Sequence, residues 1–188
     1  MERAEDDLHA QVCQGDKNAF EVFCLGIEKP LFGYVRQAVK DSDDAKELVQ
    51  EVLLRVYRMA RSGELTQRRG SPRALAFSIA HNLAVDHLRH HANVTRFDHG
   101  DHVTPHVSAV ERALLREQLD KALADLPENH RSAIALRAFG QLSYAEIAEA
   151  LGATPASVKT WILRARRRLA ELLDRDGQYL GEGHHEMR

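Results

Sequence analysis

The stretch that decides the fold runs from Ser143 to Leu169 and reads SYAEIAEALGATPASVKTWILRARRRL. Ser143 and Glu146 have the spacing of a capping box, in which each side chain bonds the other residue's backbone N–H at the start of a helix. Gly152 stands where a helix can end on a left-handed residue, and Thr154-Pro155 supplies the cap and first position of the next helix. Stop and start signals so close together predict a helix-turn-helix.

The two helices of this motif each sort their residues by face. In the first helix the predicted buried stripe is Tyr144, Ile147, Ala148 and Leu151. In the second helix the predicted inward face is apolar and consists of Val158, Ile162, Ala165, Leu169 and Leu172, with Trp161 at its edge. The outward face mixes a hydroxyl, a leucine and cations, and consists of Ala156, Thr160, Leu163, Arg164 and Arg167, flanked by Lys159 and Arg166.

A leucine among cations on an outward face favours base reading over simple solvation. Leucine can contact a thymine methyl, arginine or lysine can bond guanine, and flanking arginines can hold phosphates. The second helix of such a motif enters the major groove by its N-terminal half. The alternative is a basic surface helix that is only solvated. We predict DNA contacts by Thr154, Ser157, Lys159, Thr160, Leu163, Arg164, Arg166 and Arg167.

Composition sets the class of the whole chain. Its 188 residues suit one large or two small domains, and Ala, Leu, Arg and Glu dominate over strand formers, which predicts an all-α fold. No apolar run approaches the roughly 20 residues that span a bilayer, and the acidic N-terminus lacks a signal-peptide core. We therefore expect no membrane insertion and a cytoplasmic location.

Charge is concentrated in two blocks although the net charge is only −2. Five acidic residues and one lysine lie between Asp41 and Glu51, whereas residues 155–170 hold five cations and no acid. Such a chain can meet two different partners, although both blocks could also be ordinary solvated faces. No Ser-His-Asp, paired-carboxylate, phosphate-loop, CxxC or HExxH pattern is present, so we expect no enzyme activity, catalytic residue, cofactor or metal.

Local signals divide the chain into two small helical domains joined by a flexible linker. Asp16 or Asn18 can cap a helix toward Lys40, and Ser42 can cap one from Asp43 to about Arg61. The helix that starts at Ser71-Pro72 is apolar nearly all round and should be central. The predicted organisation is a first domain over residues 1–93, a linker over 94–108, a second domain over 109–175, and a loose tail over 176–188. Within the second domain, Pro127 opens a helix that Gly140 closes.

Four runs in order carry a resemblance to a known family. Asp43–Tyr57 (DDAKELVQEVLLRVY), Ile79–Arg89 (IAHNLAVDHLR), Leu126–Arg131 (LPENHR) and Leu142–Gly152 (LSYAEIAEALG) resemble segments of bacterial RNA polymerase sigma factors. Order, spacing and length are similar to the extracytoplasmic-function (ECF) group of the sigma-70 family, which keeps sigma regions 2 and 4. The resemblance covers roughly residues 8–173.

The resemblance implies a sigma factor that directs promoter-specific initiation by recognising −10 and −35 elements. Its expected partners are core RNA polymerase (the β′ coiled coil and the β flap), promoter DNA and an anti-sigma factor. Region 2 would cover the first domain, and region 4 would cover the second and read the −35 element. The implied polymerase-binding residues lie on the helix after Ser42 and are Glu47, Gln50, Glu51, Leu54 and Arg58. An ordinary solvated face is the alternative for them.

For the −10 element, the resemblance points to the helix that starts at Pro72. Asn82 matches a polar position whose amide can pair with a flipped base, with a side chain satisfied in the core as the alternative. Arginines nearby could hold the single strand's phosphates. Leu75 and Ser78 depart from many relatives, which carry Trp and Arg there. The expected −10 set is Arg68, Arg69, Arg73, Asn82 and Arg89.

The sequence leaves three other interpretations. A conventional helix-turn-helix regulator would bind a palindrome as a dimer, but it has no need of the acidic helix after Ser42. A helical adaptor that only borrows the fold has no need of a base-reading face. A metal-binding or pH-sensing linker is suggested by the clustered histidines, although no cysteine or ordered scaffold accompanies them. These histidines are His99, His102, His106, His184 and His185.

Overall fold

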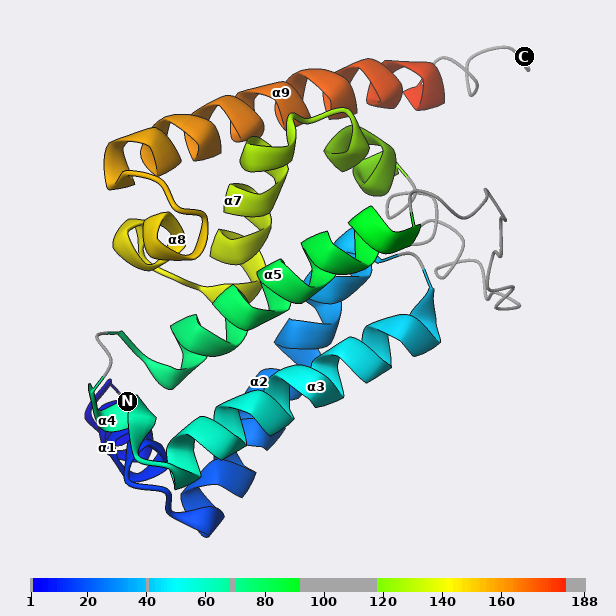
Figure 1. Cartoon of the computed structure of the whole chain (residues 1–188). Coiled ribbons are helices and arrows are strands. Elements are labelled where there is room, and N and C mark those ends of the chain that lie inside the picture. The colour runs from blue at the N-terminus through cyan, green and yellow to red at the C-terminus, as the bar shows by residue number, and fades with distance from the viewer. Residues whose placement is uncertain (1, 40, 68–69, 92–117, 182–188) are drawn as a thin grey trace.

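The computed structural model describes residues 2–39, 41–67, 70–91 and 118–181, and within these ranges it contains helices and turns but no strand (Figure 1). The all-α prediction is confirmed. None of these helices is long and apolar enough to cross a membrane. The helices are α1 (Glu2–Cys13), α2 (Lys17–Ala38), α3 (Ser42–Arg61), α4 (Glu64–Gln67), α5 (Pro72–His91), α7 (Glu128–Gly140), α8 (Tyr144–Ala150) and α9 (Pro155–Gly181), and residues 118–124 are also helical.

Side-chain caps start α2 and α5 as predicted. The Asp16 carboxylate accepts a hydrogen bond from the backbone N–H of Ala19 at 2.7 Å. The Ser71 hydroxyl accepts one from the N–H of Ala74 at 3.1 Å, and α5 begins at the proline that follows. Each cap satisfies a backbone donor that the first turn of a helix leaves without a partner. The short helices α1 and α4 were not predicted.

The cap of α3 differs from the prediction. Asp41, and not Ser42, takes the extended backbone of a cap, and its carboxylate accepts from the N–H groups of Asp43 at 2.7 Å and Asp44 at 3.1 Å. Aspartate caps a helix about as well as serine does. Its negative charge is also favoured by the positive end of the helix dipole, which explains why it takes the position.

Helix α5 lies between two halves of the molecule (Figure 1). Helices α1–α4 lie on one side of it and α7–α9 on the other; we call residues 2–91 the N-terminal half and residues 118–181 the C-terminal half. A continuous hydrophobic core crosses α5 from one half to the other. Covered on both sides, α5 needs apolar residues nearly all round, as its sequence has. Its buried residues are Pro72, Ala76, Phe77, Ala80 and Ala84.

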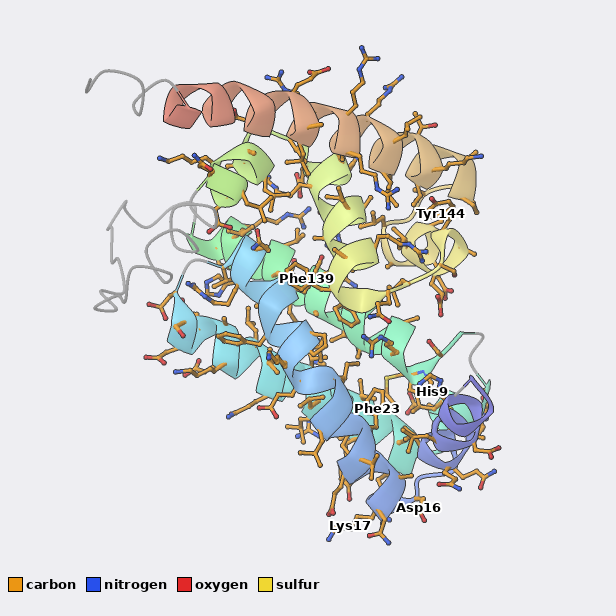
Figure 2. All side chains as sticks on the ribbon, turned by 180° about the vertical axis from the view of Figure 1, so that it is seen from behind. His9, Asp16, Lys17, Phe23, Phe139 and Tyr144 are labelled. Atoms are coloured by element: carbon orange, nitrogen blue, oxygen red, sulfur yellow. The ribbon has the colours of Figure 1, made fainter. Side chains whose placement is uncertain are left out.

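The two halves pack closely where α7 ends. The Phe139 ring lies against Gly33 of α2, where a Cβ atom would come within 2.8 Å of the ring (Figure 2). Helix α7 does end at Gly140, but the left-handed residue is Gln141, with φ +55°. Gly140 instead allows close packing, since a Cβ there would lie 2.9 Å from Leu142 Cγ. The sequence did not predict the packing of Phe139 on Gly33, which joins the two halves.

The last helix is longer than predicted. Helix α9 continues to Gly181, so residues 176–181 are helical where a loose tail was expected to begin at 176. No proline follows Pro155 in α9, and the single Gly177 costs only about 1 kcal/mol relative to alanine, which does not stop a helix. The predicted linker over 94–108 and the last residues, 182–188, lie outside the described residues.

The packing at Gly33 generates a matched test on α2. Gly33→Ala and Gly26→Ala add the same methyl group to the same helix, but nothing lies within 4 Å of a Cβ at Gly26. We expect Gly33→Ala to unfold with a free energy about 1–3 kcal/mol lower than Gly26→Ala, because its methyl overpacks the contact with Phe139. Urea unfolding of both variants measures the difference. Equal stabilities would show that the halves do not pack in this way.

Candidate nucleic-acid interface

The turn between α8 and α9 forms as the sequence predicted. The backbone N–H of Ser143 donates to Glu146 Oε2 at 2.8 Å, and Ser143 Oγ accepts from the N–H of Glu146 at 3.3 Å, which completes the capping box. Gly152 has φ +61°, in the left-handed region. Thr154 Oγ1 then accepts from the N–H of Ser157 at 3.2 Å, and α9 begins at Pro155. These local bonds fix the angle at which α9 leaves α8.

The inward face of α9 is buried largely as predicted. Val158, Ile162, Ala165 and Leu172 are buried, and Trp161 and Leu169 are half-buried.

The prediction for Tyr144 was wrong. Its side chain is 37% exposed at the start of α8 (Figure 2), and the Arg137 guanidinium lies 5.7 Å from the centre of its ring. A tyrosine in the first turn keeps its polar hydroxyl in water while the cation covers its face. Ile147 and Ala148 therefore form the buried part of α8, with Leu151 half-buried.

The outward face of α9 presents the residues for which we predicted DNA contacts. Leu163 is 69% exposed, and Ser157 alone of the set is half-buried. Arg167 forms an ion pair with Glu171 at 3.2 Å. Within the described residues, the side chains of Lys159, Arg164 and Arg166 form no ion pair. The exposed members of the set are Thr154, Lys159, Thr160, Leu163, Arg164, Arg166 and Arg167.

The acidic helix α3 lies on the side of the molecule opposite α9 (Figure 1). Of the residues expected to bind polymerase, Glu47, Gln50, Leu54 and Arg58 are exposed, and Glu51 is half-buried. Leu54 is 41% exposed, and the polar or charged residues Gln50, Glu51 and Arg58 lie about one turn away from it on the same helix. Glu51 accepts from Arg55 Nε at 2.6 Å. The two charged faces therefore point in different directions and could be occupied at the same time.

The residues expected at the −10 element are only partly brought together. Asn82 and Arg89 are exposed on α5, and Arg89 lies 3.7 Å from the carboxylate of Asp86. The exposure of Asn82 excludes the alternative that its side chain is satisfied in the core. Arg68 and Arg69 lie outside the described residues.

Arg73 is engaged by the C-terminal half. Its Nε donates to the carbonyl of Gly140 at 2.7 Å and its Nη2 to the carbonyl of Phe139 at 3.4 Å, and its guanidinium lies 5.7 Å from the Phe77 ring centre. The last carbonyls of a helix lack partners within it, and the negative end of the helix dipole attracts a cation. In this arrangement Arg73 holds the end of α7 and is not presented to a nucleic acid.

Glu146 links the starts of two helices from different halves. Besides closing the capping box, it accepts a hydrogen bond from the Ser71 hydroxyl at 3.0 Å. Burial would raise the pKa of Glu146, but the hydrogen bonds from Ser143 and Ser71, with a smaller contribution from His9, lower it on balance.

A cavity of about 650 Å³ lies between the halves, and the sequence did not indicate it. In the wall formed by the N-terminal half, the Tyr34 hydroxyl lies 3.0 Å from His81 Nδ1. Burial lowers the pKa of His81, although the charge of Glu128 opposes the shift. In the described part of the chain no group of three or more His, Cys, Asp or Glu residues could hold a metal ion. The histidines of the linker and tail lie outside that part.

Comparisons with known proteins agree with the geometry. Residues 27–94 match the family model for Sigma-70 region 2, and residues 116–169 match that for Sigma-70, region 4. The chain is 29% identical over 185 residues to the RNA polymerase sigma-H factor of Pseudomonas aeruginosa, covering 90% of this chain and 93% of that one. It is 28% identical over 179 residues to the ECF RNA polymerase sigma factor SigK of Mycobacterium ulcerans, covering 90% and 95%.

Two solved structures are similar over most of the chain. CnrH in complex with the cytosolic domain of CnrY has a TM-score of 0.67 and 25% identity, covering 92% of this chain and 99% of that one. RpoE in complex with the anti-sigma factor NepR from Bartonella quintana has a TM-score of 0.66 and 26% identity, covering 82% and 96%.

The lowered pKa of Glu146 predicts a pH dependence of stability. A carboxylate with a lowered folded-state pKa stabilises the fold above its ordinary value, 4.5, and this contribution disappears as the pH falls through the folded-state value. The difference in unfolding free energy between the wild type and Glu146→Gln should thus be full at neutral pH and shrink below about pH 4.5. Denaturant unfolding at several pH values measures it. In a Ser143→Ala background the pH-dependent part of this free-energy difference should be smaller. A free-energy difference that does not change with pH would contradict the hydrogen bonding described.

Proposed function

The chain belongs to the extracytoplasmic-function group of the sigma-70 family, and from this we propose how its surfaces act. It binds core RNA polymerase and directs promoter-specific initiation by recognising −10 and −35 elements. The observation that carries the proposal is the pair of exposed faces, acidic on α3 and basic on α9, at opposite sides of one molecule. Polymerase performs the chemistry, and this chain acts beside it in the cytoplasm as an initiation factor and not as a catalyst.

At the −35 element, α9 enters the major groove. Lys159 and Arg164, which form no ion pair with a described residue, are suited to bond base edges or phosphates, while Thr154 and Ser157 lie at the helix N-terminus, where phosphates bind. Arg166 and Arg167 hold backbone phosphates, so binding weakens as salt rises. Five cations are few for tight binding alone. Helix α9 therefore supplies only part of the affinity for the promoter, and polymerase supplies the rest.

On polymerase, the α3 face with Glu47, Gln50, Glu51, Leu54 and Arg58 docks on the β′ coiled coil. Leu54 is suited to be the apolar anchor because charged side chains surround it and keep the rim of the contact polar. The C-terminal half contacts the β flap. A regulator that binds DNA by itself would have no use for this acidic face. A helical adaptor would have no use for the exposed face of α9.

Simultaneous reading of both elements requires the two halves to separate. A compact chain of 188 residues has a radius of gyration of about 16 Å, or a diameter of about 40 Å. The centres of −10 and −35 elements are about 25 base pairs apart, or about 85 Å at 3.4 Å per step. We infer that the closed arrangement opens on polymerase, which releases Arg73 from α7 to join Arg68, Arg69, Asn82 and Arg89 at the −10 strand.

Control by an anti-sigma factor is part of the proposal. The similar structures of CnrH and RpoE are complexes with CnrY and with the anti-sigma factor NepR. A partner that covers the α3 face or holds the two halves together would keep the chain from polymerase or from the promoter.

Run-off transcription tests the function directly. Core RNA polymerase is given a random promoter library with and without this chain, and transcripts are sequenced. We expect a set of transcripts that depends on the chain and shares two spaced motifs upstream of the start. If no promoter-dependent transcript appears, the sigma function is wrong.

Two kinds of variant should each lose one binding activity, either −35 binding or polymerase association, and keep the other. Lys159→Glu or Arg164→Glu should weaken −35 binding about tenfold or more while polymerase association stays intact, because each replaces a DNA contact by repulsion. Leu54→Arg should weaken polymerase association about thirtyfold, the effect of losing an interface anchor, while −35 contacts survive. Leu25→Arg serves as the control, since Leu25 is 80% exposed on α2 outside both faces. Joint loss of both bindings in one variant would indicate unfolding and would contradict the assignment.

A further inference from the structure

We propose that α9 reads thymine methyl groups in the −35 element, through a strip formed by Ala156, Thr160 and Leu163. We call these three residues the methyl strip. The inference rests on the proposed −35 role of α9 and specifies its chemistry: the strip selects A·T pairs by apolar contact, while its cationic neighbours hold guanines or phosphates.

Leu163 is the first observation. It is 69% exposed on α9, whereas the apolar residues on the other face of the same helix, such as Val158 and Ile162, are buried. Thr160 and Ala156 are exposed on the same side, about one and two turns toward the helix start from Leu163. Apolar surface gains free energy when another apolar surface covers it, and here the surrounding side chains are cations that attract DNA.

The hydroxyl of Thr160 is the second observation. Thr160 Oγ1 donates to the backbone carbonyl of Ala156 at 3.0 Å, inside the helix. In this conformation its only hydrogen is used and is not directed to a base acceptor such as guanine O6 or N7, while its lone pairs can still accept from a base donor such as adenine N6. The γ-methyl of Thr160 extends the apolar surface between Ala156 and Leu163.

The dimensions of the strip fit a short run of base pairs. Leu163 follows Ala156 by seven positions, which corresponds to a rise of about 10 Å along the helix. At 3.4 Å per step this corresponds to about three base pairs. Thymine is the base that presents a methyl group in the major groove, so it is the partner of such a strip. Lys159 and Arg164 lie beside the strip and are placed for the base pairs or phosphates at its borders.

Deoxyuridine tests the proposal at the level of one methyl group, because it lacks only the thymine methyl. A −35 element is first selected from the random library with polymerase and this chain, and each thymine of either strand is then replaced singly by deoxyuridine. We expect one or more replacements within about three adjacent base pairs to weaken promoter binding about fourfold. That fold-change corresponds to about 0.8 kcal/mol for one buried methyl-sized group.

Variants of the chain assign the methyl contact to the strip. In Leu163→Ala the loss caused by deoxyuridine should vanish at one of the sensitive positions, whereas Leu25→Ala, which removes another exposed leucine, should leave it unchanged. Thr160→Val keeps the γ-methyl and loses the hydroxyl, and Thr160→Ser does the reverse. We expect Thr160→Val to retain the sensitivity to deoxyuridine and Thr160→Ser to lose it at one position.

The outcomes separate this inference from the proposed function. Absence of any chain-dependent transcript defeats the sigma function itself. Transcription from a selected element that contains no A·T pair, or that tolerates every deoxyuridine, keeps the sigma function and overturns the methyl strip. Sensitivity that Leu163→Ala leaves intact, or that follows the Thr160 hydroxyl in place of its methyl, overturns it as well, and Leu163 would then contact protein.

Discussion

Helix α5 must bury apolar side chains on two opposite sides, and the arrangement of the whole chain depends on this. On one side it packs on α2 and α3, and on the other it meets α7 and α8, so Phe77 is buried between Tyr34 and the end of α7. The two glycines Gly33 and Gly140 let backbone and rings approach closely enough to seal that junction. With a helix that is apolar on one side only, the contact of α2 with α7 at Gly33 and Phe139 would have to join the halves without this shared core.

The same helix carries residues that we propose to bind the −10 strand, so burial of its apolar surface competes with access of those residues to DNA. Asn82 is exposed, but Arg73 is held at the end of α7 through the bonds that help to keep the halves together. Opening uncovers apolar surface of α5 and α7, so the closed state is favoured in the free chain. Only a partner that binds the open state more tightly can shift this balance. We propose that core polymerase docks on α3 and on the C-terminal half, and such a partner is suited to supply that difference.

Local features of the fold could be predicted from the sequence, and long-range ones could not. The capping box of Ser143 and Glu146 and the left-handed Gly152 depend on bonds within a few residues, so the turn and the exposed face of α9 followed from spacing alone. The sequence did not decide between Asp41 and Ser42 as the cap of α3, because adjacent aspartate and serine residues cap a helix almost equally well. Tyr144 was predicted to be buried from its helical spacing, but its polar hydroxyl favours an exposed position at the start of α8.

The contact between the halves was beyond sequence reasoning, because Arg73 and Phe139 are separated by 66 positions and nothing in either segment names the other. The DNA-reading and polymerase-binding roles of single residues remain predictions, since they depend on partners.

Separation of the two halves on polymerase can be measured as the distance between one residue in each half. Donor and acceptor dyes are attached to cysteines introduced at Gly26 and Ala170, both exposed, in a chain whose Cys13 and Cys24 are replaced by alanine. Single-molecule energy transfer is then recorded for the free chain and for its complex with polymerase and promoter. We expect one short distance between the dyes in the free chain and a distance longer by tens of ångströms in the promoter complex. The same short distance in both states would contradict the separation of the halves.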